Sequence, residues 1–139
     1  MTYINKDTAS KERNIRIKHV LLAIRELNQM GEINDKTRDL VAFIAINLSE
    51  IYNGIDASVV AWEKRGYWVK ADKYRMDWMW TKNISDKLTK ALSNDNFADV
   101  IASLPVIFSK LETTTLAKSA KLPDEYVGAY VLLKKAGQG

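Results

Sequence analysis

Helix start and stop signals recur along this chain, and their positions constrain its fold more than any other feature of the sequence. They separate about five segments whose apolar residues repeat at helical spacing. None of these segments shows the alternation of apolar and polar residues that is typical of a half-buried strand. We therefore predict an all-α fold, a helical bundle of about five helices with one long, aromatic-rich central helix.

The length of the chain, 139 residues, is that of a single domain. We expect one helical-bundle domain over residues 1–139, with residues 1–7 as an N-terminal arm. The first helix is predicted from Thr8 or Ser10 to Met30, where Gly31 provides a left-handed stop.

The second helix is predicted to begin with Asn34 or Asp35 as its N-cap and to end at Tyr52, before the pair Asn53-Gly54. Its middle, residues 40–46, is apolar nearly all round, which indicates a central position in the bundle.

The third helix is predicted over residues 56–93. Asp56 is suited to be its N-cap, and no strong breaker follows before residue 93, although Gly66 is a weak point. At 1.5 Å per residue such a helix would be roughly 55 Å long. Because a domain of this size is shorter than that, we expect a bend or a projecting end.

The fourth helix is predicted to start at Phe97, capped by Asn94 or Asn96, and to kink or restart at Pro105. The last helix is predicted to start at Pro123, with acidic residues in its first turn and lysines in its last.

Composition excludes several classes of protein. The chain has no cysteine, which excludes disulfides and thiolate metal sites. Its apolar runs are far shorter than the about 20 residues that span a bilayer, and its first residues do not resemble a signal peptide. We expect a cytoplasmic protein with no membrane contact. The net charge of +4 permits acidic partners without requiring them.

The predicted third helix contains all four tryptophans of the chain. Plotted at 100° per residue, its apolar residues form two stripes on nearly opposite sides. One stripe, which we assign to the core, consists of Trp62, Gly66, Val69, Met76 and Trp80. The other, which we assign to a surface, consists of Tyr67, Ala71, Tyr74 and Trp78.

Three interpretations of the two stripes remain open. The helix could be buried on both sides by its own chain. It could pack inward on one side and form a homo-oligomer through Tyr67, Ala71, Tyr74 and Trp78, since aromatic residues are enriched in interface cores. It could instead bind nucleic acid through aromatic stacking and phosphate contacts. The residues for that third function are Lys64, Arg65, Trp68, Lys70, Lys73 and Arg75.

Catalytic motifs are scarce. The single histidine, His19, excludes sites that need two histidines, and neither a phosphate-binding glycine loop nor a nucleophile elbow occurs. The run from Arg13-Asn14 to His19 resembles the motif of HEPN ribonucleases, a resemblance that implies metal-independent RNA cleavage by Arg13 and His19. We predict a non-catalytic binding module that self-associates through the third helix and holds no metal or cofactor. Nucleic-acid binding is the first alternative, and a HEPN-like ribonuclease is the second.

Overall fold

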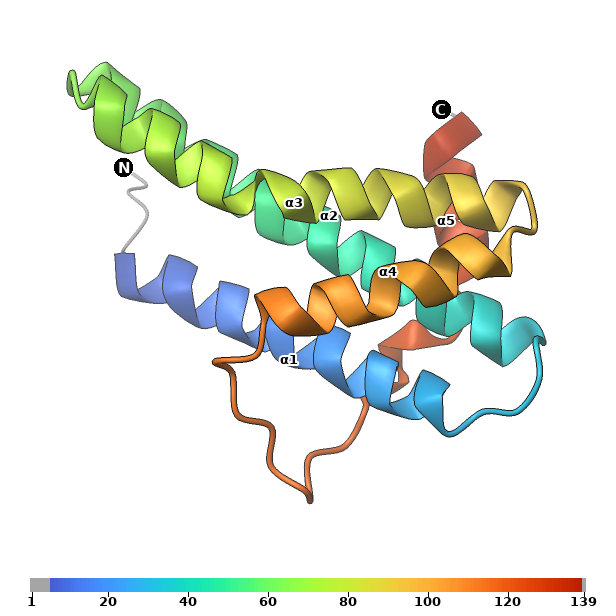
Figure 1. Cartoon of the computed structure of the whole chain (residues 1–139). Coiled ribbons are helices and arrows are strands. Elements are labelled where there is room, and N and C mark those ends of the chain that lie inside the picture. The colour runs from blue at the N-terminus through green and yellow to red at the C-terminus, as the bar shows by residue number, and fades with distance from the viewer. Residues whose placement is uncertain (1–5, 139) are drawn as a thin grey trace.

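The computed structural model describes residues 6–138, and in this part of the chain all regular structure is helical. The prediction of an all-α bundle with five α-helices is thereby confirmed (Figure 1). In chain order the elements are α1 (Lys6–Asn28), α2 (Asp35–Lys64), α3 (Trp68–Ser93), α4 (Phe97–Lys110), the 3₁₀ helix η1 (Asp124–Tyr126) and α5 (Ala129–Gln138).

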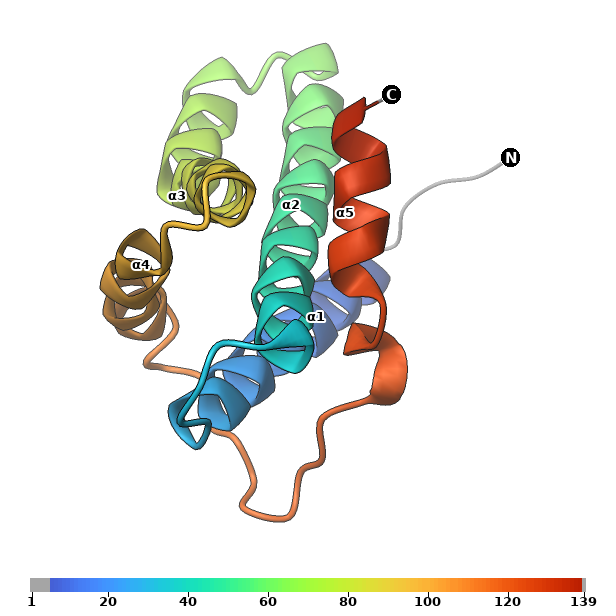
Figure 2. The ribbon, with the colours of Figure 1, turned by 90° about the vertical axis from the view of Figure 1, so that its right-hand side faces the viewer.

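Helix α2 is the centre of the fold, as the apolar run in its sequence indicates. Figure 2 shows α1, α3 and α5 arranged around it. Leu40, Ile44 and Leu48 are fully buried along α2. Asn34 caps this helix as predicted, because its side chain accepts a hydrogen bond from the Thr37 amide at 3.0 Å and Thr37 bonds back to the Asn34 amide.

The predicted end of the second helix at Tyr52 is wrong, because α2 continues through Asn53-Gly54 to Lys64. The buried series Ile51, Ile55 and Val59 carries the apolar stripe past the glycine. Glycine in an exposed helix costs about 1 kcal/mol against alanine. Burial of one large aliphatic side chain contributes about 1.5–3 kcal/mol, so packing outweighs the glycine.

The break in the chain lies instead at Gly66, and the predicted single helix over 56–93 is wrong. Gly66 has a φ of 85°, the left-handed conformation that glycine adopts readily. The amide of Tyr67 donates to the Trp62 carbonyl and that of Gly66 to the Glu63 carbonyl, both at 3.0 Å. These two bonds form a Schellman motif. Helices α2 and α3 are therefore the two arms of a hairpin, and its closed end extends past the other helices (Figure 1).

Other helix boundaries differ by less. Helix α1 begins at Lys6, so only residues 1–5 of the predicted arm lie outside the described part. Asn96 caps α4 through the Asp99 amide as predicted, but α4 continues through Pro105 without restarting. The segment from Pro123 is not one helix, since the positive φ of Gly128, 82°, separates η1 from α5.

Helix α5 is tied to the bundle by a carboxylate from α2. Asp39 accepts hydrogen bonds from the amides of Gly128 and Tyr130, both at 3.0 Å. A negative charge at the start of a helix also stabilises the helix dipole. The irregular segment that leads to η1 is held by Arg25, which donates to the carbonyls of Ala117 and Ala120. None of the helices described is both long and apolar enough to cross a membrane.

Candidate functional site

The inner side of the hairpin is closed by aromatic packing between its two arms. The rings of Trp62 on α2 and Tyr74 on α3 have centroids 4.9 Å apart. Arg13 of α1 donates to the Tyr74 hydroxyl at 2.8 Å, and its guanidinium lies over the Trp78 ring at 5.3 Å. Ala71 is fully buried on the same side of α3. These contacts anchor the hairpin to the start of α1.

The structure thus corrects part of the assignment of the two stripes, although Trp62 and Trp80 pack against the core as predicted and Tyr67 is exposed as predicted. Ala71 is buried, and Tyr74 and Trp78 pack against the core of their own chain, although they were assigned to a surface. Val69 and Met76, assigned to the core, are 85% and 77% exposed. The physical reason is the break at Gly66. It moves Trp62 onto the opposite arm, where it covers the stripe that a single helix would have left open.

Four large apolar side chains near the closed end of the hairpin remain exposed. We name this set the hairpin patch, and it consists of Tyr67, Trp68, Val69 and Met76. Val69 and Met76 are seven residues apart and therefore lie on one face of α3. Of the predicted interface residues, Tyr67 alone belongs to this patch.

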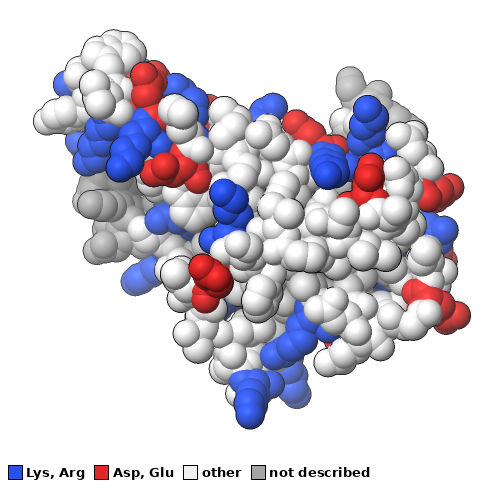
Figure 3. All heavy atoms as spheres, in the orientation of Figure 1, with Lys and Arg blue, Asp and Glu red and all other residues white. Residues whose placement is uncertain are grey.

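Charged residues of both signs surround the hairpin patch. Figure 3 shows basic and acidic side chains interleaved over this end of the molecule. Arg75 joins the two arms, since its guanidinium lies 3.5 Å from Glu63, 3.7 Å from Asp72 and 4.0 Å from Asp56. The charge of Arg75 is therefore compensated within the chain.

The other residues predicted for nucleic-acid binding gather at the same end. Lys64, Arg65, Trp68, Lys70 and Lys73 are all exposed. Lys70 extends over the ring of Trp62, with its Nζ 4.4 Å from the ring centroid. A hollow of about 590 Å³ lies beside this pair, and Arg13, Arg65 and Tyr74 contribute to its walls.

The two residues of the HEPN-like pattern contact different parts of the fold. Arg13 contacts Tyr74 and Trp78, whereas His19 stacks on Phe43 with ring centroids 5.6 Å apart. Six residues on a helix correspond to a turn of about 120° between the two side chains, so α1 directs them to different sides. Among the residues described, no cluster of three or more acidic, histidine or cysteine side chains is placed to hold a metal ion.

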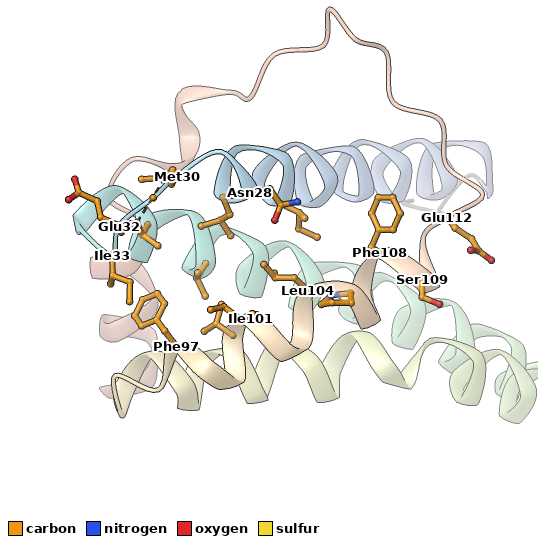
Figure 4. A pocket seen from close by; sticks show the side chains of 17 residues that line it. Asn28, Met30, Glu32, Ile33, Phe97, Ile101, Leu104, Phe108, Ser109 and Glu112 are labelled. Atoms are coloured by element: carbon orange, nitrogen blue, oxygen red, sulfur yellow. Dashed lines mark hydrogen bonds between the residues drawn. The ribbon is translucent and has the colours of Figure 1, made fainter.

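A second surface, which the sequence prediction missed, is an apolar groove between α1 and α4. It has a volume of about 710 Å³ and includes the turn between α1 and α2 (Figure 4). Ile101 and Phe108 of α4 and Ile33 of the turn line it and are exposed. Helix α4 is apolar on more sides than one packing contact needs, and this signal in the sequence could have indicated the groove.

Comparisons of the chain with protein-family models, with curated proteins and with solved structures find no match. A function for this chain is therefore inferred from the geometry of the hairpin patch and of the groove.

Proposed function

We propose that this protein is a non-catalytic binding module whose first partner is a second copy of itself, joined through the hairpin patch. The observation that carries the proposal is the exposure of Tyr67, Trp68, Val69 and Met76 together at the end of a projecting hairpin. Several large apolar side chains exposed in one region of a surface are typical of interaction sites. A cytosolic location, compatible with the absence of cysteine, belongs to the same proposal.

The size of the patch supports a contact between protein chains. A standard interface buries about 800 Å² on each partner. Aromatic side chains bury about 150–250 Å² each. Tyr67 and Trp68, with Val69 and Met76 beside them, supply a large part of that area, and the flanking charged residues supply the rim.

The mixture of charges around the patch favours a second copy over a partner of one sign. In a two-fold symmetric dimer the same surface meets itself, so each charge needs an opposite charge on the same patch. Lys73 and Asp77 are both exposed on α3 beside Met76. A surface that carries both signs can pair with its own copy, whereas a uniformly basic surface would repel it.

Nucleic-acid binding is the second candidate, because exposed Trp68 lies among Lys64, Arg65 and Lys70. Single-stranded nucleic acid binds where bases stack on aromatic rings and cations contact phosphates. The carboxylates Glu63, Asp72 and Asp77 at the same end weaken the attraction for phosphates. We therefore place this function second.

Light scattering at tens of micromolar protein tests the proposal. The chain has a mass of 15.8 kDa, and we expect at least twice that value in solution. The double variant Val69→Gln/Met76→Gln should return to a monomer with unchanged helix content. Ile101→Gln, which removes an exposed apolar side chain from α4, should keep the wild-type mass.

Two outcomes decide against the proposal. A monomeric wild type at these concentrations would contradict self-association. Quenching of tryptophan fluorescence by a single-stranded oligonucleotide, with an affinity that falls steeply as salt is raised, would assign the hairpin end to nucleic-acid binding instead.

A further inference from the structure

The apolar groove has a floor, walls and an exposed rim. Its floor is part of the protein core, because Ile24, Val41 and Val100 are buried beneath it. Figure 4 shows Leu104 and Ile101 projecting from α4 into the groove and Asn28 facing them from the end of α1. An apolar partner seated here would therefore extend the core.

The length of the groove along α4 corresponds to that of a short helix. The apolar side chains of α4 that line the groove run from Phe97 to Phe108 (Figure 4). Eleven residues of α-helix span about 16 Å, which is three turns. A third helix laid between α1 and α4 would bury Ile101 and Phe108, in the way that amphipathic helices occupy apolar grooves.

The charges that line the groove are all acidic. Glu32 lies at one end of it and Glu112 at the other (Figure 4), and among the residues whose side chains are described neither lysine nor arginine contributes to the lining. The polar group of Thr37 is already used, since its hydroxyl donates to the Glu32 carbonyl at 2.8 Å. The carboxylates of Glu32 and Glu112 are therefore the groups that can attract a charged ligand to the groove.

We propose that this groove binds an amphipathic α-helix of about three turns, with basic residues at both ends, from another protein. The apolar face of the helix would lie on Ile101, Leu104 and Phe108, and its basic ends would meet Glu32 and Glu112. A fatty acid suits the groove less well, because its carboxylate would face acidic side chains at either end. The site is separate from the hairpin patch and does not depend on self-association.

Two synthetic peptides of about 14 residues test the proposal with the full chain. Both carry leucines at helical spacing, one has two lysines at each end, and the other has two glutamates there. Fluorescence anisotropy of the labelled peptides should show that the lysine-ended peptide binds about tenfold more tightly at low salt. The double variant Glu32→Gln/Glu112→Gln should bring the two affinities close together.

Two exposed positions on different sides of α4 provide a matched pair of variants. Ile101 lines the groove and is 65% exposed, whereas Val106 is 47% exposed and lies outside it. Because both are accessible in the folded chain, neither change is expected to unfold it. Ile101→Gln should weaken the lysine-ended peptide by about tenfold, the effect of losing one aliphatic contact. Val106→Gln should leave binding unchanged.

Several results would overturn the proposal. They are equal affinity for the two peptides in the wild type, no binding of either, or an equal loss with Ile101→Gln and Val106→Gln. Binding of dodecanoate without binding of the lysine-ended peptide would assign the groove to a lipid-like ligand. The Val69→Gln/Met76→Gln variant should still bind the peptide, so failure of the dimer and failure of the groove are distinguished.

Discussion

Trp62 and Tyr74 face each other across the α2–α3 hairpin with their ring centroids 4.9 Å apart. This pair closes the hairpin within one chain and leaves the opposite side of α3 open. It therefore decides which side chains are available to a partner. The proposed contact through the hairpin patch depends on this arrangement.

Loss of the aromatic pair should destabilise the fold. We expect Trp62→Ala to lower the free energy of unfolding by about 2–3 kcal/mol, somewhat less than for a fully buried tryptophan. Urea denaturation followed by circular dichroism measures this change. Trp68→Ala, at an exposed position beside the turn, should change stability by no more than about 0.5 kcal/mol. Equal losses in the two variants would show that Trp62 does not hold the arms together.

Two glycines of the hairpin should respond to alanine with opposite signs. Gly66→Ala forces a side chain into a left-handed conformation and should destabilise the fold by about 1–2 kcal/mol. Gly54 lies within α2, and a Cβ added there meets no atom within 4 Å. Gly54→Ala should therefore raise the free energy of unfolding by up to about 1 kcal/mol. A stabilising Gly66→Ala would instead support one continuous helix over residues 56–93.

The attachment of α5 should depend on Asp39. Removing its carboxylate leaves the amides of Gly128 and Tyr130 without their acceptor, at a cost of about 1–2 kcal/mol. Hydrogen exchange in Asp39→Ala should be faster through residues 128–135 than in the wild type. Asp35, like Asp39, belongs to α2 and lies in its first turn. Asp35→Ala should therefore accelerate exchange at the start of α2 only. Unchanged exchange in α5 would contradict its anchoring by Asp39.

Local sequence signals predict the fold class correctly. The one large error in the predicted helix boundaries concerns Gly54 and Gly66. The order Asn53-Gly54 is typical of a helix end, so local signals favour a stop at Gly54 and a tolerated glycine at Gly66. Packing decides the matter, since the buried series Ile51, Ile55 and Val59 belongs to one helix that extends across Gly54. Local helix propensity does not report the burial of such a series against other helices.

The candidate site was harder to predict than the fold. Of the exposed side chains in the hairpin patch, the stripe pattern assigns only Tyr67 to a surface, whereas it places Val69 and Met76 in the core. The break at Gly66 explains this error, because it puts Trp62 on the other arm. The groove was not predicted at all. It joins residues of α1, the following turn and α4, which are far apart in the sequence and come together only through the packing of α1 on α2, α2 on α3 and α3 on α4.

A single introduced cysteine tests the proposed self-association most directly, because the chain has none of its own. Met76→Cys places a thiol on the exposed side of α3, and Ser119→Cys places one on an exposed segment away from the hairpin. Under mild oxidation at micromolar protein we expect Met76→Cys to form a disulfide-linked dimer rapidly and Ser119→Cys to remain largely monomeric. Equal cross-linking of the two variants, or none at residue 76, would contradict a dimer formed through the hairpin patch.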